Sequence, residues 1–211
     1  SRGGFPEVVS YSVAPSFGVT KGNVVDVNAT SQAIRRTMSE IRSDVGVDVK
    51  SAYVGITGSH IGYENRVDHF SDIGRQGVVT LDEFAKIPSM VADGLQIPGR
   101  SIIHSLPIHY GVDGHNGIKN PVGMHVTGLE VTTHLITADS YFADKLREAV
   151  TLSGIELKSM VLEPFASSES ILTQTEKDIG SAVVDIGGGT TDIVLFRNGS
   201  VVYPAVIPVG G

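Results

Sequence analysis

Residues 182–196, AVVDIGGGTTDIVLF, place three consecutive glycines between two apolar runs that are rich in β-branched residues. This pattern predicts two β-strands joined by a tight turn at Gly187, Gly188 and Gly189. Because glycine has no Cβ, the successive backbone N–H groups of such a turn can converge on an anion, and amide concavities of this kind bind phosphate. The segment has neither the GxxxxGK[ST] pattern of a Walker A loop nor the GxGxxG pattern that opens a dinucleotide-binding helix. The turn is therefore a candidate phosphate site of another type.

Polar side chains on both sides of the turn fit a magnesium nucleotide. Asp185, at the end of the first predicted strand, could hold Mg²⁺ through water, because this ion keeps several of its waters and takes few carboxylates. Thr190 and Thr191 add two hydroxyl donors. A second interpretation stays open from the residues alone, since glycines between strands also form purely structural turns and threonine is common in sheets.

Strand and helix signals alternate through much of the remaining chain, which predicts an α/β core. A helix is expected from Asn28 or Thr30 to about Gly46, because apolar residues recur at positions 34, 38, 41 and 45. The other predicted elements of this core are strands at residues 8–13, 24–27, 51–57 and 129–137, and a helix that ends at Gly154.

Residues 59–131 differ from this core in being polar, glycine-rich and histidine-containing. A helix is expected to begin at Thr80, because Thr80 and Glu83 have capping-box spacing, and Pro88 should end or kink it. Pro107 interrupts an extended run and predicts a sheet edge or a bulge. The segment is therefore predicted to be a small α+β module inserted into the α/β core.

The composition excludes several classes of function. The 211 residues include 16 Lys and Arg against 23 Asp and Glu, and a net charge of −7 disfavours a nucleic-acid partner, whose phosphates need clustered cations. The absence of cysteine excludes disulfides, thiolate nucleophiles and sulfur-ligated zinc. No two of the seven histidines have the spacing of a metalloprotease helix, and no apolar run is long enough to span a bilayer. The chain begins without Met and ends in an apolar run, so we expect a fragment of a longer protein.

Several motifs resemble those of the FtsA family of actin-like bacterial cell-division proteins. Residues 184–192, VDIGGGTTD, look like the second phosphate motif of the actin, Hsp70 and sugar-kinase superfamily. The segment between Ser59 and Val131 resembles an insertion that other members of the superfamily lack. More specific likenesses to FtsA occur, in the same order and spacing, at residues 13–16 (VAPS), 21–26 (KGNVVD), 58–61 (GSHI), 117–124 (GIKNPVGM), 172–177 (LTQTEK) and 206–211 (VIPVGG).

The resemblance implies an actin-like, ribonuclease H-like fold. Residues 1–58 and 132–211 would form part of subdomain 1A, and residues 59–131 would form the inserted subdomain 1C. It also implies that ATP and Mg²⁺ are bound, with Asp185 as the metal residue. The first phosphate motif, the second lobe and a C-terminal amphipathic helix of the family do not occur in this sequence. We therefore expect only part of the nucleotide cleft here.

The resemblance further implies a scaffold at the division septum. Members of the family assemble into filaments, tether the tubulin-like FtsZ to the cytoplasmic face of the inner membrane through that helix, and recruit later division proteins. A main role as an enzyme is not expected, and hydrolysis would be slow. The alternative is an ATPase or kinase of the same superfamily, which needs a general base beside the cleft. The sequence alone does not locate one, so no catalytic residue is assigned.

Overall fold

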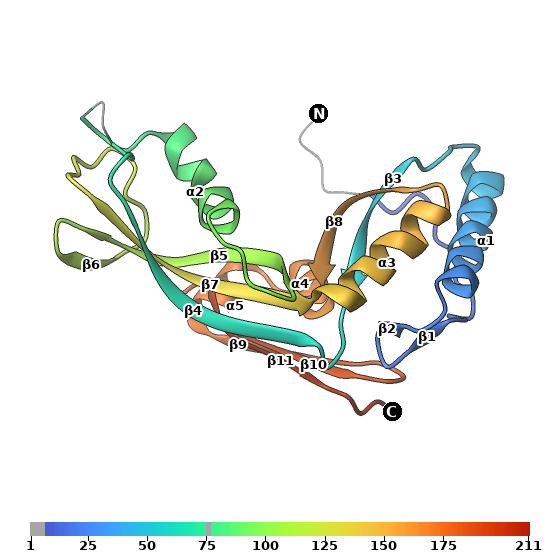
Figure 1. Cartoon of the computed structure of the whole chain (residues 1–211). Helices are drawn as coiled ribbons and strands as arrows, with labels where there is room; N and C mark the ends of the chain where they lie inside the picture. The colour runs from blue at the N-terminus through green and yellow to red at the C-terminus, as the bar shows by residue number, and fades with distance from the viewer. Residues whose placement is uncertain (1–6, 75–76) are drawn as a thin grey trace.

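The computed structural model describes residues 7–74 and 77–211 and confirms a mixed α/β chain. Figure 1 shows an elongated arrangement, with α2 at one end, α1 and α3 at the other, and α4, α5 and the last three strands between them. The elements in chain order are β1 (Val19–Thr20), β2 (Asn23–Val24), α1 (Val27–Val45), β3 (Ser51–Ile56), β4 (Ile61–Phe70), α2 (Leu81–Asp93), β5 (Arg100–Val112), β6 (His115–Ile118), β7 (Leu129–Asp139), α3 (Ser140–Leu152), β8 (Glu156–Leu162), α4 (Glu163–Ile171), α5 (Gln174–Ile179), β9 (Ser181–Ile186), β10 (Thr191–Arg197) and β11 (Ser200–Ile207).

One end of the molecule is built on a parallel pair of strands. β3 pairs with β8, and α1 and α3 contact each other beside this pair (Figure 1). Parallel strands need a crossover connection, and here that connection contains α3 together with the whole segment from β4 to β7. The predicted insertion therefore lies inside a β-α-β unit. None of the helices in the described residues is long and apolar enough to cross a membrane.

Helix α1 begins earlier than the sequence predicted. Asp26 is its N-cap, in place of Asn28 or Thr30, because the Asp26 carboxylate accepts a hydrogen bond of 3.0 Å from the Ala29 N–H. The helix ends as predicted before Gly46, which adopts the left-handed conformation with φ of 70°.

The strand predicted at residues 8–13 is absent. These residues have no regular structure, and their valines are exposed. Ser10 and Ser12 instead donate hydrogen bonds to Asp44 and Glu40 of α1. Strand composition alone is not sufficient, because a strand also needs a neighbour with which to pair.

The other end is an antiparallel sheet in the order β4-β7-β5-β6, with α2 on one face (Figure 1). The capping box of Thr80 and Glu83 is confirmed, although α2 continues past Pro88 to Asp93. Pro107 lies at a register shift, which confirms the predicted bulge. Helix and sheet share a core of Ile73, Val79, Ile87, Val91, Tyr110, Val112, Leu129, Val131 and Leu135. This end is thus an α+β module with its own core.

Strand β7 crosses the limit predicted between the two subdomains. It pairs with β4 from Leu129 to Ala138 and with β5 from Leu129 to Asp139, and Val131 is fully buried within it. A division between residues 131 and 132 would cut through one continuous strand. The limits 1–58, 59–131 and 132–211 therefore stay a prediction, and the strand pairing favours an end of the inserted module at Asp139.

The last three strands form a separate antiparallel sheet in the order β11-β10-β9. No strand of it pairs with β3 or β8 in the described residues, and the sequence interpretation groups both sheets in one subdomain. Val183, Val194 and Phe196 of this sheet pack with Phe165 of α4. This packing places the glycine turn between β9 and β10 close to the ends of β3 and β8.

Candidate functional site

The glycine turn has the predicted form, with residues 187–190 between β9 and β10. The Gly187 N–H closes the turn by donating a hydrogen bond of 2.9 Å to the Thr190 carbonyl oxygen. Gly188 is exposed, and a Cβ placed on it would meet no atom within 4 Å. The outer side of the turn is therefore open to a ligand.

Two other segments pack against the inner side of this turn. A Cβ on Gly189 would lie 3.2 Å from the Lys21 Cα, so the turn between β1 and β2 touches it. A Cβ on Gly210 would lie only 2.4 Å from the Gly187 carbonyl oxygen, and the Gly211 N–H donates to that same oxygen at 3.0 Å. Glycine at position 210 is therefore needed for this close approach of two backbones.

The structure brings Asp185 to the edge of the same site. Asp185 is half-buried on β9, and its carboxylate accepts a hydrogen bond of 2.6 Å from the Ser167 hydroxyl on α4. Within the described residues, no group of three His, Asp or Glu side chains could hold a metal ion. A role for Asp185 in holding Mg²⁺ through water remains a prediction.

The two predicted threonines use their hydroxyl groups within the protein. Thr190 is buried and donates to the Asp192 carboxylate at 3.0 Å, whereas Thr191 donates to the Val209 carbonyl oxygen at 2.8 Å. Both hydroxyls therefore fix the shape of the turn, and the backbone N–H groups of Gly188 and Gly189 are the candidate donors to a phosphate, since that of Gly187 donates within the turn.

Asp192 is a residue of this site that the sequence analysis did not select. Its side chain is 2% exposed and accepts hydrogen bonds from Thr57 at 2.5 Å and from Thr190. Burial raises its pKa, and the two hydroxyl bonds oppose that rise. The signal that could have found it is a carboxylate in the period-two pattern of β10, on the same buried face as Val194 and Phe196.

Glu163 is the second residue that the sequence analysis missed. It is the first residue of α4, and burial, followed by the negative charges of Asp192 and Asp185, raises its pKa. A Cβ on Gly55 would lie 3.0 Å from Glu163 Oε1, so the glycine in β3 leaves room for this carboxylate. A carboxyl group with a raised pKa beside a candidate phosphate site has the properties of a general base or acid. The signal was an acidic residue next to Pro164, where a predicted strand meets a helix.

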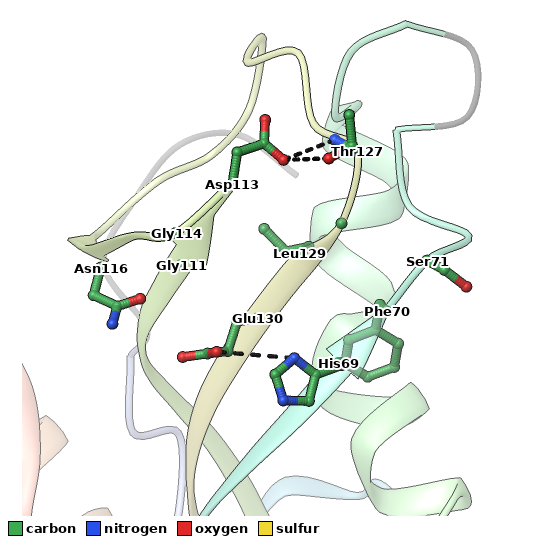
Figure 2. A pocket seen from close by; sticks show the side chains of 11 residues that line it. His69, Phe70, Ser71, Gly111, Asp113, Gly114, Asn116, Thr127, Leu129 and Glu130 are labelled. Atoms are coloured by element: carbon green, nitrogen blue, oxygen red, sulfur yellow. Dashed lines mark hydrogen bonds and ion pairs between the residues drawn. The ribbon is translucent and has the colours of Figure 1, made fainter.

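A separate cavity of about 300 Å³ lies at the outer end of the inserted module (Figure 2). His69 Nδ1 lies 3.8 Å from Glu130 Oε2, and Asp113 accepts a hydrogen bond of 2.6 Å from the Thr127 hydroxyl. The hydrogen bonds from Thr127 lower the pKa of Asp113. This cavity shares no residue with the glycine turn, and Figure 2 shows His69 paired with Glu130 and Asp113 paired with Thr127 in it. We do not assign the candidate phosphate site to it.

The chain is similar to known proteins over nearly its whole length. Residues 58–137 match the family described as the SHS2 domain inserted in FtsA. The chain is 34% identical over 212 residues to the cell division protein FtsA of Pseudomonas aeruginosa, covering 97% of this chain and 49% of that protein. It is 29% identical over 211 residues to FtsA of Escherichia coli K12, covering 99% and 49%, and 30% identical over 205 residues to FtsA of Bacillus subtilis, covering 97% and 46%.

A solved structure has the same fold. The PilM-PilN type IV pilus biogenesis complex aligns with a TM-score of 0.60 at 15% identity, covering 94% of this chain and 53% of that one. Together with the family match, this likeness confirms the predicted fold class, an actin-like α/β core with an inserted α+β module. The chain is therefore similar to the FtsA family of cell division proteins, and it spans about half the length of the curated relatives that it matches.

Proposed function

We propose that this chain is the part of an actin-like cell-division scaffold that contacts the phosphates of ATP. The observation that carries the proposal is the open turn at Gly188, which has Asp185 at one edge and Asp192 and Glu163 behind it. The backbone N–H groups of the turn would bind the phosphates, and Asp185 would hold Mg²⁺ through water. The similarity to FtsA supports the assignment to cell division.

The role that we propose for the full-length protein in the cell is the one that the resemblance to the FtsA family implies. The full-length protein would assemble into filaments, tether FtsZ at the cytoplasmic face of the inner membrane and recruit later division proteins to the septum. The inserted module has its own core and projects away from the glycine turn (Figure 1). A module in this position is suited to contacts with other proteins, because it has no part in holding phosphate.

A second candidate function is ATP hydrolysis or phosphoryl transfer. The observation that favours it is Glu163, whose pKa is raised beside Asp185 and Asp192. In a scaffold, the same carboxylate would support slow hydrolysis that resets the filament. The rate of ATP turnover in the full-length protein, with and without FtsZ, separates the two functions.

Calorimetry with Mg-ATP on the full-length protein tests the proposed function. Asp185→Asn keeps an oxygen that can accept the Ser167 hydrogen bond but removes the charge, so binding should weaken and its dependence on Mg²⁺ should be lost. Asp178→Asn is the matched control, because Asp178 is an exposed carboxylate on α5. Unchanged Mg-ATP affinity in the Asp185→Asn protein would remove this residue from the site. The present chain alone should bind ATP weakly, since the adenosine contacts lie outside it.

A further inference from the structure

His104 and Leu162 form a hydrogen bond between the inserted module and the start of α4. The Leu162 N–H donates to His104 Nε2 at 2.9 Å, and the two residues are 58 positions apart. His104 lies in β5 of the inserted sheet, whereas Leu162 is the last residue of β8 and the N-cap of α4. One side-chain acceptor thus connects the two parts at a helix end.

This bond replaces a cap that α4 does not have. In α2 and α5, the N-cap N–H groups of Thr80 and Thr173 donate to the glutamates three residues later, at 2.8 and 2.7 Å. The N-cap of α4 is Leu162, which forms no side-chain cap, and the corresponding third position is Phe165. His104 therefore provides from another element the acceptor that the other two helices provide for themselves.

The surroundings hold the imidazole in the state that this bond requires. The His104 and Phe165 rings lie 5.1 Å apart, and Leu162 is fully buried. Burial lowers the pKa of His104 to about 4, so the ring is neutral at physiological pH and Nε2 can accept a hydrogen bond. The proton of the neutral ring must then be on Nδ1.

The first turn of α4 faces the candidate nucleotide site. Glu163 directly follows Leu162, and Ser167, one helical turn further, donates to Asp185. A cavity of about 310 Å³ then opens between β5 and α4, lined among others by Leu106, Phe165 and Ser168. The helix and the strand are therefore not packed along their whole length, and the hydrogen bond of His104 fixes the end of α4 that carries Glu163.

We propose that His104 is a positioning residue that couples the inserted module to the phosphate site by holding the amino end of α4. A displacement of β5 would move Leu162 and Glu163 with it. It would thereby change the binding of Mg-ATP by Asp185 and the glycine turn. The identity of this ligand rests on the proposed function, whereas the coupling through α4 rests on the contacts of His104.

Three variants of the full-length protein test the coupling. His104→Leu removes the acceptor, His104→Gln keeps an acceptor near the position of Nε2, and His109→Leu makes the same change elsewhere on β5. In the His104→Leu protein, the backbone amides of residues 162–168 should exchange with solvent about fivefold faster, and Mg-ATP affinity should fall about fivefold, the effect of one lost hydrogen bond. His104→Gln should restore both, and His109→Leu should change neither. Nitrogen NMR of the wild-type imidazole should show the proton on Nδ1.

Each outcome decides the proposal. Unchanged amide exchange in the His104→Leu protein, or a proton on Nε2 in the wild type, would overturn the role of His104 in holding α4. Faster exchange with unchanged Mg-ATP affinity would overturn the coupling and leave the proposed function intact. If the wild-type protein bound no Mg-ATP, the proposed function would fail and the coupling to nucleotide with it, while the exchange result would still decide whether His104 holds α4.

Discussion

The hydroxyl of Thr57 donates a hydrogen bond of 2.5 Å to Oδ1 of Asp192, 135 positions further along the chain. Thr57 directly follows β3, and Asp192 lies in β10, so this bond joins the parallel pair to the three-stranded sheet. Both residues are buried, and a Cβ on Gly22 would lie 2.8 Å from Thr57 Cγ2. The site behind the glycine turn is therefore assembled from three segments that are distant in sequence.

Removing the Thr57 hydroxyl should destabilise the fold. Thr57→Val keeps the shape but leaves the buried Asp192 carboxylate with the hydroxyl of Thr190 alone, and a lost bond to a buried charged group costs about 1 to 3 kcal/mol. Urea unfolding measures the change. Thr57→Ser, which keeps the donor, is the control and should lose less. Equal losses in the two variants would mean that the methyl group, not the hydrogen bond, matters.

Alanine at position 210 should disturb the glycine turn. Its Cβ would lie within 2.5 Å of backbone atoms of Gly187, Gly188 and Gly189, so the two segments must separate. We expect a loss of about 1 to 3 kcal/mol, as for other overpacked sites, together with shifted amide resonances in residues 187–189. Gly211→Ala has open space around the new Cβ and should behave as the wild type. A Gly210→Ala variant with wild-type stability and unshifted amide resonances would contradict the close contact.

Alanine at position 188 should weaken ligand binding without destabilising the fold. The added Cβ meets no protein atom within 4 Å, so the melting temperature should not fall. It would, however, occupy the space in which we place the phosphates, and loss of one phosphate hydrogen bond of about 1.5 kcal/mol weakens binding about tenfold. Calorimetry of full-length Gly188→Ala with Mg-ATP gives the answer. Normal affinity would show that phosphate does not bind on this side of the turn.

Stability should fall in mildly acidic solution because of buried histidines. Burial lowers the pKa of His104 to about 4, and burial also lowers the pKa values of His60 and His134. Since an unfolded histidine titrates near about 6.5, the unfolded state takes up protons first, and the contribution of His104 is lost as the pH falls from about 6.5 to about 4.

The comparison of wild type with His104→Gln isolates this effect. Between pH 7 and pH 4.5, the wild type should lose about 2 kcal/mol more unfolding free energy than the variant, because the glutamine does not titrate. Urea unfolding at the two pH values provides the measurement. The same loss in both proteins would assign the acid sensitivity to other groups.

Reversing the charge of Lys119 should weaken assembly more than nucleotide binding. Lys119 is exposed in the inserted module, and its ammonium group donates to the Asn198 carbonyl oxygen at 3.1 Å. We expect Lys119→Glu to weaken filament formation by about 1 kcal/mol or less in sedimentation with ATP, at unchanged Mg-ATP affinity. Lys86→Glu, on α2 of the same module, controls for net charge. Normal assembly of the Lys119→Glu protein would place the filament contact elsewhere.

Local features of this fold could be predicted from the sequence, because the residues that indicate each feature lie within a few positions of the feature itself. The glycine turn, the capping box at Thr80 and the bulge at Pro107 belong to this class. The start of α1 was missed by two residues or more, since Asp26, Asn28 and Thr30 are all good caps and only the side-chain geometry selects Asp26.

The features that the sequence did not predict depend on partners far along the chain. Periodicity identifies β7 as a strand, but it does not say that β4 and β5 are its neighbours. Likewise, Asp192 and Glu163 become part of the site only when the end of β3 and α4 meet the last sheet. Residues 8–13 have the composition of a strand but form none, because no neighbouring strand among the described residues pairs with them.

Strand β7 has a mechanical consequence. Its 11 residues lead from the outer end of the inserted sheet directly into α3, with β4 and β5 bonded on its two sides. A force along this strand would act in shear on many hydrogen bonds at once, so the module would transmit the force with little deformation. The force would reach the two places where the chain passes between the inserted module and the α/β core. There the Asp139 N–H donates to the His60 carbonyl oxygen at 3.3 Å, and the Ser140 N–H donates to that of Gly99 at 2.9 Å. Tension along the proposed filament should therefore open these two bonds before it distorts the sheet.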